Sequence, residues 1–249
     1  MKIQLIKRYD TWHTTPSDAS HNDCFIVEYP KSGITWFSTI LANIIKLQND
    51  YNHLNITFFN LRTIVPDIHL GRKIGPKTYT IPHQRFIKSH AQFNKNYKTV
   101  IYLVRNPTDV MNSMYRYQIS RAQYNYSFSE FIRSKNGLCG WVNHVDSWLN
   151  SSPAGGVLHL LRYEDLVDNA EKCLRPLLAN LGWAVCDKHL LQAIQMSSVD
   201  IMKSSEKQFT DNDPRYDLSF IKSHPLKISQ DDLDYIHYKT KHLGHVFTR

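Results

Sequence analysis

The sequence lacks several features that would assign it to a particular class of protein. No apolar run approaches the roughly 20 residues that a membrane-spanning helix needs, and residues 1–10 contain no signal-peptide core. The four cysteines, at positions 24, 139, 173 and 186, include no CxxC pair, so neither a zinc site nor a redox dithiol is indicated. These absences predict a cytoplasmic protein without a membrane span.

Composition and charge indicate a folded chain with an anionic partner. Hydrophobic residues make up 42% of the 249 residues and aromatic residues 12%, which excludes a disordered chain and suits a single domain over 1–249. The net charge of +8 favours anions. Its basic residues are scattered and form no run of five or six, so the charge alone fits nucleic acid, an acidic membrane surface or a polyanionic cofactor.

The stretch 25–36 is the most informative part of the chain. Residues 25–27 are apolar and β-rich, as in a strand buried in a parallel sheet, and Pro30 ends that strand. From Ile34 onward, apolar residues recur at helical spacing. The turn 31–33 therefore leads into a helix N-terminus, where unpaired backbone N–H groups favour an anion.

The residue types of this turn also suit a phosphate group. Gly33 allows close approach of the backbone, Ser32 and Thr35 bring hydroxyl groups, and Lys31 brings a positive charge. Trp36 is placed to stack on a nucleobase. The spacing differs from that of a Walker A loop, so a nucleoside triphosphate is not the expected ligand. An ordinary strand-turn-helix joint is the plain structural alternative.

Elsewhere, strands alternate with helices, which predicts an α/β fold with a parallel sheet and ligands at the carboxyl ends of the strands. Further strands are expected over 85–90, 99–104 and 157–161. Helices are expected over 34–47, 110–120, 128–134, 141–149, 188–204 and 231–243. Another is expected to follow 162–165 and to run to about 181, and a short one is expected around 58–65. Asn106 is a good N-cap for the helix that follows the third strand, and Asp109 stands where a capping-box acid would lie.

Residues 29–36, Tyr-Pro-Lys-Ser-Gly-Ile-Thr-Trp, resemble the phosphosulfate loop of the sulfotransferases, which use 3′-phosphoadenosine 5′-phosphosulfate (PAPS) as donor. The family usually has threonine in place of Ile34, whose backbone N–H stays available to the donor. The resemblance implies a three-layer α/β/α fold with a central parallel sheet, related to the P-loop NTPases. It also implies in-line transfer of a sulfuryl group to a hydroxyl or amine of a small-molecule or glycan acceptor.

The resemblance extends to residues outside this loop. Lys88-Ser-His90 matches a family motif in which the histidine is the catalytic base, and Lys31 and Lys88 would stabilise the displaced charge. Residues implied in donor binding are Lys31, Ser32, Gly33, Ile34, Thr35, Trp36, Arg105 and Ser113 (the 3′-phosphate), Tyr163 and Ser197 (the adenine), and Lys222. The C-terminal arginine and glycines of the family clasp are missing around Lys222, and Val199 stands where the family usually has phenylalanine.

Other functions remain open at this point. A nucleotide kinase or another phosphoryl transferase on a related sheet would need Mg²⁺ and normally a Walker A loop. A basic nucleic-acid-binding module fits the net charge but gives no reason for Lys-Ser-His at a strand end. The loop-rich region 56–82 is interpreted as part of an acceptor pocket, near which lie Phe58, Phe59, Tyr79 and Phe93. Neither the acceptor nor an oligomeric state is indicated.

Overall fold

The structure is a computed structural model that describes residues 15–51, 53–57, 60–68, 73–75, 77, 79–83, 85–122, 126–151, 155–210 and 226–247. Lys222, Phe58 and Phe59 lie outside the described residues. Within the described ranges, no helix is both long and apolar enough to cross a membrane. The predicted cytoplasmic location stays a prediction.

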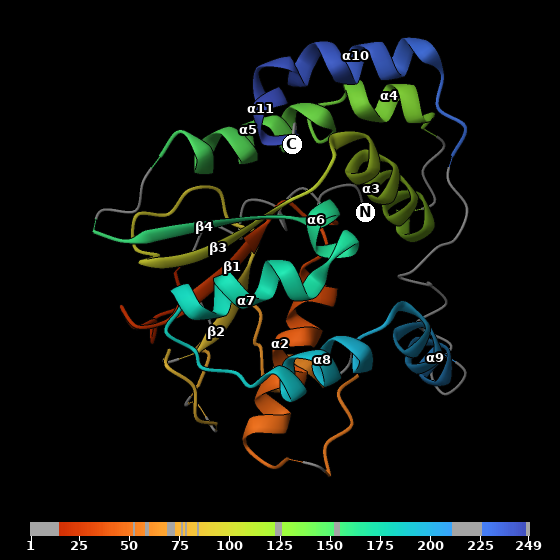
Figure 1. The fold of residues 1–249 in the computed structure, drawn as a ribbon. Helices are drawn as coiled ribbons and strands as arrows, with labels where there is room; N and C mark the ends of the chain where they lie inside the picture. The colour runs from red at the N-terminus through yellow and green to blue at the C-terminus, as the bar shows by residue number, and fades with distance from the viewer. Residues whose placement is uncertain are drawn as a thin grey trace.

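Four parallel strands form the central sheet, in the order β2-β1-β3-β4 (Figure 1). They are β1 (Cys24–Glu28), β2 (Phe86–Ser89), β3 (Thr99–Val104) and β4 (Val157–Arg162). The register pairs Val27 of β1 with Ser89 of β2, and Glu28 with Leu103 of β3. All four strands therefore end at the same edge of the sheet, next to the turn 31–33, His90, Arg105 and Tyr163.

Helices cover both faces of this sheet, so the predicted three-layer arrangement is confirmed (Figure 1). One layer contains α2 (Ile34–Gln48), α7 (Ala170–Asn180) and α8 (Asp187–Met196). The other contains α3 (Pro107–Ala122), α4 (Phe128–Arg133), α5 (Leu138–Leu149), α10 (Gln230–Thr240) and α11 (Gly244–Phe247). The remaining elements are α6 (Tyr163–Asp168), α9 (Val199–Thr210) and the 3₁₀ turns η1 (Leu61–Thr63) and η3 (Lys241–Leu243).

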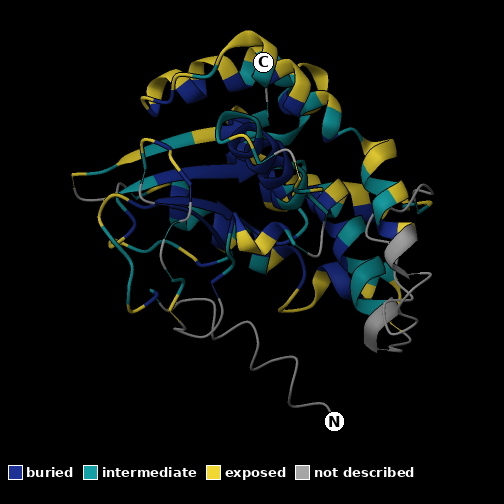
Figure 2. Ribbon diagram, turned by 90° about the horizontal axis from the view of Figure 1, so that it is seen from below, coloured by how far each residue is buried: buried dark blue, intermediate teal, exposed yellow. Residues whose placement is uncertain are grey.

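Strand β1 divides the core because its side chains alternate between the two layers. Cys24 and Ile26 pack in the cluster that includes α2 and α8, whereas Phe25 and Val27 pack in the cluster that includes α5. Figure 2 shows the sheet as the most buried part of the molecule, with exposed residues on the outer sides of the helices. Glu28 follows in this alternation, and its carboxylate is only 2% exposed.

Two predicted helices are each divided in the structure. The helix expected after 162–165 and up to about 181 is broken at Asn169, which has the extended angles φ −154° and ψ 89° and caps α7 by accepting the N–H of Lys172. The helix expected over 188–204 stops at Met196, and a second one starts at Val199. Of the helix expected around 58–65, the described residues show only the 3₁₀ turn η1. At Asn169 a local side-chain cap competed with the helical pattern.

Candidate functional site

The turn between β1 and α2 forms a tight loop at the carboxyl edge of the sheet. Lys31 (φ 79°) and Gly33 (φ 111°) both have positive φ, which reverses the chain within a few residues. Ser32 is buried, and its hydroxyl donates to the carbonyl oxygen of Tyr29 at 2.8 Å. Thr35 lies half-buried in the first turn of α2. The predicted strand, turn and helix are thus confirmed, with the serine hydroxyl bonded inside the turn.

Aromatic side chains cover one side of this loop. A Cβ atom on Gly33 would lie 2.4 Å from Cδ2 of Tyr163, so the tyrosine ring packs directly on the glycine. Trp36 meets the same ring edge-on at a centroid distance of 5.8 Å. Its indole N–H donates to the carbonyl oxygen of Ser197 at 2.9 Å. Gly33 is therefore required both by its backbone angle and by the neighbouring ring.

The N–H of Ile34, which was expected to be available to the donor, donates in the structure to Oε2 of Glu28 at 2.7 Å. Glu28 stands at the end of β1, where the inward side-chain direction carries its carboxylate under the helix N-terminus. Burial raises the pKa of Glu28 to about 7, against the Ile34 hydrogen bond and the charges of Lys31 and Lys88, which lower it.

His90 follows β2 and lies beside the end of β1. Its Nδ1 is 3.2 Å from the carbonyl oxygen of Glu28 and 3.9 Å from Oε1 of the same residue. A carbonyl oxygen only accepts hydrogen bonds, so Nδ1 carries the hydrogen in this contact. In the neutral ring Nε2 then holds the lone pair, which is the form that a general base needs. The side chain is 27% exposed.

The two lysines have different surroundings. The ammonium of Lys88 is nearly buried and lies 2.9 Å from Oδ1 of Asp67, so a carboxylate already balances its charge. The ammonium of Lys31 lies 4.9 Å from the ring centroid of Tyr117, on α3. Both lysines lie close enough to Glu28 to lower its pKa. The positive charge expected around the turn is therefore present.

Arg105 connects the end of β3 to the same turn. One terminal nitrogen (NH1) donates to the carbonyl oxygen of Lys31 at 3.2 Å, and the guanidinium stacks on Tyr163 at 4.3 Å. Its Nε is buried without a hydrogen-bond partner in the described part of the protein. A planar cation with an unsatisfied donor suits a phosphate group. Ser113 lies half-buried further along α3.

The start of α3 is capped in part by a residue from another element. Asn106 is the N-cap, as predicted, and its side chain accepts the N–H of Thr108 at 2.9 Å. The backbone N–H of Asn106 donates to Oε1 of Glu164, on α6, at 2.8 Å. Glu164 is thus the acid that caps this N–H, whereas the sequence suggested Asp109, which is exposed. The segments after β3 and β4 are thereby joined beside Arg105.

Ser197 lies at the junction of α8 and α9 and is fully buried. Its hydroxyl donates to the carbonyl oxygen of Ala193 at 2.8 Å and accepts from Nδ2 of Asn43 at 2.9 Å. These bonds fix the segment on which Trp36 rests. Val199 is 48% exposed nearby in sequence. The structure gives the hydroxyl of Ser197 protein partners, and a role of this residue in adenine binding stays a prediction.

The aromatic residues proposed near the acceptor pocket have packing contacts where they are described. Tyr79 is buried, and its hydroxyl donates to the carbonyl oxygen of Ile64 at 2.8 Å. Phe93 meets Trp148 edge-on at 5.4 Å. Among the described residues, no group of three or more His, Cys, Asp and Glu side chains is arranged for a metal ion.

The structure thus brings the turn 31–36, His90, Arg105 and Tyr163 together from four strand ends, as expected. Sequence reasoning missed Glu28, Asp67 and Tyr117, which contact these residues, and it missed the contact of Glu164 with Asn106. Only Glu28 gave a signal, since a lone acid closed an otherwise apolar strand directly before the turn.

Comparison with known proteins identifies the family. Residues 21–224 match the sulfotransferase domain. Sulfotransferase 1 family member D1 of Mus musculus is 28% identical over 207 residues, which cover 76% of this chain and 68% of the relative. Sulfotransferase 1B1 of Mus musculus is 26% identical over 219 residues, which cover 80% and 70%.

Solved structures show the same fold. The structure of mouse sulfotransferase SULT7A1 complexed with PAP gives a TM-score of 0.56 at 22% identity and covers 82% of this chain and 73% of that one. Retinol dehydratase in complex with androsterone and inactive cofactor PAP gives a TM-score of 0.66 at 15% identity, with coverages of 94% and 82%. With its site at the carboxyl edge of a four-stranded parallel sheet, the chain therefore belongs to the sulfotransferase family, whose enzymes take the sulfuryl group from PAPS.

Proposed function

We propose that the chain transfers a sulfuryl group from PAPS to a hydroxyl or amine with His90 as the general base. The observation that supports this most directly is the placement of His90. Its Nδ1 is held by the carbonyl oxygen of Glu28, 3.2 Å away, at the end of the strand that leads into the turn 31–33. This contact selects the tautomer in which Nε2 accepts a proton.

The reaction follows from these positions. The acceptor oxygen or nitrogen attacks the sulfur of PAPS in line with the leaving 5′-phosphate, and Nε2 of His90 takes the proton that the acceptor loses. The bond from sulfur to the bridging oxygen breaks, which releases 3′-phosphoadenosine 5′-phosphate (PAP). Lys31 and Lys88, whose charges both act on Glu28, stabilise the negative charge that develops on the bridging oxygen.

Donor binding is assigned to residues around the same turn. Ser32, Gly33, Ile34 and Thr35 line the helix N-terminus that faces the 5′-phosphosulfate, and the ring of Tyr163 lies against Gly33. Arg105 and Ser113 take the 3′-phosphate, where the buried Nε of Arg105 gains an acceptor. Trp36, Tyr163 and the segment of Ser197 flank the adenine, and Lys222 contributes to the 3′-phosphate site.

The acceptor is proposed to be a small molecule or glycan that carries a hydroxyl or amine, and the whole chain, 1–249, is proposed to form one domain. No metal is required in this scheme, because lysines supply the positive charge that Mg²⁺ supplies in phosphoryl transfer. The spacing of residues in the turn 31–33 also differs from that of a Walker A loop, which disfavours a kinase. An acceptor screen with radiolabelled PAPS identifies the acceptor class.

Substitution of His90 tests the proposed base. His90→Ala should lower turnover by about 10²-fold to 10⁴-fold, while the affinity for PAP, measured by calorimetry without magnesium, stays close to that of the wild type. His83→Ala is a matched control, since His83 lies before β2, at the opposite edge of the sheet. Turnover that survives in His90→Ala, or loss of PAP binding in that variant, contradicts the assignment.

A further inference from the structure

Glu28 places a carboxylate inside the turn that should receive the donor. It is the last residue of β1 and 2% exposed. Its Oε2 accepts the N–H of Ile34 at 2.7 Å, and the backbone N–H of Lys31 also bonds to it. The N–H groups that favour an anion at the N-terminus of α2 therefore already hold one, which comes from the protein itself.

Charged and titratable groups face Glu28 from each neighbouring element. Lys31 lies in the turn, Lys88 comes from β2 and is paired with Asp67, and Tyr102 comes from β3. His90 follows β2, with Nδ1 at 3.9 Å from Oε1. The two lysines favour the carboxylate and burial disfavours it, with the result that the pKa of Glu28 lies at about 7. Its protonation therefore costs little free energy near neutral pH.

A phosphate group of the donor at the same N–H groups would stand directly beside this carboxylate. Two anions that share a desolvated site strongly disfavour each other, as in pairs of carboxylates where one proton is retained. The conflict is removed if the carboxylate becomes neutral. A neutral carboxyl group can also donate its O–H to a phosphate oxygen, whereas a carboxylate cannot.

We propose that Glu28 is a resident anion of the donor site and takes up one proton from the solvent when PAPS or PAP binds. One Oε of Glu28 forms an O–H bond, the hydrogen bond to Ile34 breaks, and the N–H of Ile34 turns to a phosphate oxygen. Glu28 is then a positioning residue that keeps the turn in shape in the free enzyme and sets the affinity for the donor. The inference rests on the proposed binding of the donor at the turn 31–35, but not on the role of His90.

The proton is counted by calorimetry of PAP binding to the full chain at pH 8, in buffers that differ in ionisation enthalpy. We expect uptake of about 0.9 proton per PAP, since a group whose pKa is about 7 is mostly ionised at that pH. The PAP phosphates, whose second pKa is about 6, are already deprotonated. Above pH 7 the Kd for PAP should rise by about tenfold per pH unit.

Two variants assign the proton to a residue. In Glu28→Gln, which keeps an acceptor oxygen for Ile34 and has no charge, the uptake should fall close to zero and the Kd should stay constant between pH 6.5 and 8.5. His90→Gln should keep the uptake of the wild type, which excludes the imidazole as the group that is protonated.

Absence of proton uptake by the wild type at pH 8 would overturn the proposal, whatever the variants do. Uptake that persists unchanged in Glu28→Gln would overturn it as well. If PAP binds with the expected proton uptake while His90→Ala remains active, the proposed base is wrong and the role of Glu28 stands. If PAP does not bind at all, the donor site itself is misassigned.

Discussion

Arg105 is held in place by a carbonyl oxygen and an aromatic ring, while its buried Nε has no partner in the described part of the protein. Hydrogen bonds to charged groups contribute about 1.5–3 kcal/mol, so Arg105→Ala should weaken PAP binding by roughly 10-fold to 100-fold. Binding of adenosine 5′-phosphate, which has no 3′-phosphate, should change little. Calorimetry with both nucleotides measures the difference.

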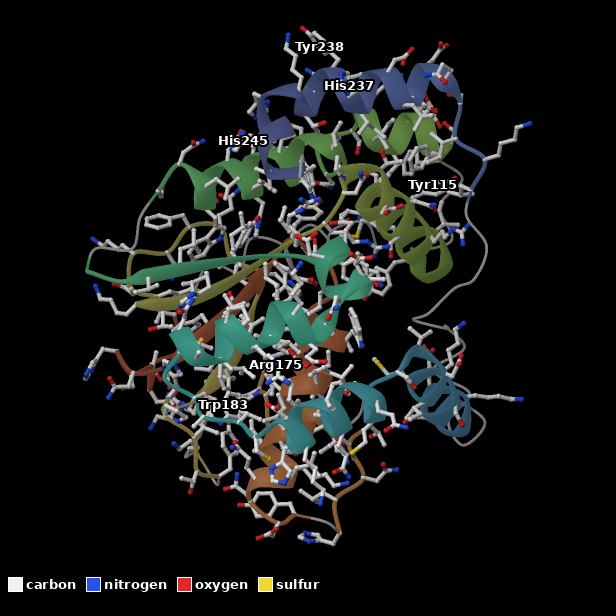
Figure 3. The ribbon with its side chains drawn as sticks, viewed as in Figure 1. Tyr115, Arg175, Trp183, His237, Tyr238 and His245 are labelled. Carbon is white, nitrogen blue, oxygen red and sulfur yellow. The ribbon has the colours of Figure 1, made fainter. Side chains whose placement is uncertain are left out.

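Arg175 offers a matched control for this substitution. It lies on α7 (Figure 3). Its side chain is 40% exposed and forms ion pairs with Glu171 and Asp187. Arg175→Ala should leave the affinity for both nucleotides unchanged. An Arg105→Ala variant that loses affinity equally for PAP and for adenosine 5′-phosphate would show that Arg105 does not read the 3′-phosphate.

A comparison of Gly33 with Gly182 separates the effect of a positive φ from the effect of the contact with Tyr163. Both have positive φ, at 111° and 66°, but a Cβ on Gly33 would meet the ring of Tyr163 at 2.4 Å, whereas a Cβ on Gly182 would meet nothing within 4 Å. Alanine should cost about 1–2 kcal/mol for the backbone at either position, and Gly33→Ala should cost clearly more. Urea unfolding of the two variants measures this difference.

The ring contact has its own test in a double variant. In a Tyr163→Ala background the obstacle beside Gly33 is removed, so Gly33→Ala should there cost about as much as Gly182→Ala. If Gly33→Ala and Gly182→Ala destabilise the wild-type protein equally, the tyrosine ring does not restrict this position.

At the scale of elements, the break at Asn169 shows where the sequence pattern was insufficient. The helix expected after 162–165 and up to about 181 runs through it, but the Asn169 side chain accepts the N–H of Lys172 at 2.9 Å and starts a new helix. This break gives α6 its own direction, which places Glu164 on the N-terminus of α3. One hydrogen bond from the backbone to the Asn169 side chain thus determines where the helix breaks and, with it, where Glu164 lies.

Removal of this cap should have a measurable effect on stability. Asn169→Ala should lower the free energy of unfolding by about 1 kcal/mol, and hence the Tm by roughly 2–4 °C for a chain of this size. Asn180→Ala, at the exposed end of the same helix, is the control and should change the Tm by much less. Equal shifts in thermal unfolding would mean that the Asn169 cap does not stabilise α7.

For the whole molecule, the order of strands and helices and the layers could be predicted because they follow from local patterns. Strand 99–104 and the entry into α2 at Ile34 agree with the structure to the residue. The partners of the site residues could not be predicted, since they are distant in sequence. Glu164 lies 58 residues from Asn106, and His90 lies 62 residues from Glu28. The register of the parallel strands brings the segments that carry these residues together.

The buried Glu28 should also make the stability of the whole protein depend on pH in an unusual direction. Its pKa rises from 4.5 to about 7 on folding, mainly through burial, so the folded state binds more protons between these values. The free energy of unfolding must therefore fall as pH rises through this window, by at most about 3 kcal/mol. For Asp18, burial raises the pKa, but hydrogen bonds from Ile74, Gly75 and Arg85 outweigh it and lower the pKa from 3.8 to about 2. The stability that Asp18 contributes is therefore lost in acid, as pH falls from 3.8 toward 2, and not in the window of Glu28.

Urea unfolding of the wild type and of Glu28→Gln at pH 5, 6, 7 and 8 isolates this contribution. The wild type should lose stability relative to Glu28→Gln as pH rises, because only the wild type must ionise a buried carboxyl group. Glu130→Gln is the matched control, because the Ser127 hydrogen bonds lower the pKa of the exposed Glu130, in the direction away from this pH range. If the stability difference between the wild type and Glu28→Gln is the same at all four pH values, Glu28 is not the buried acid that titrates near neutrality.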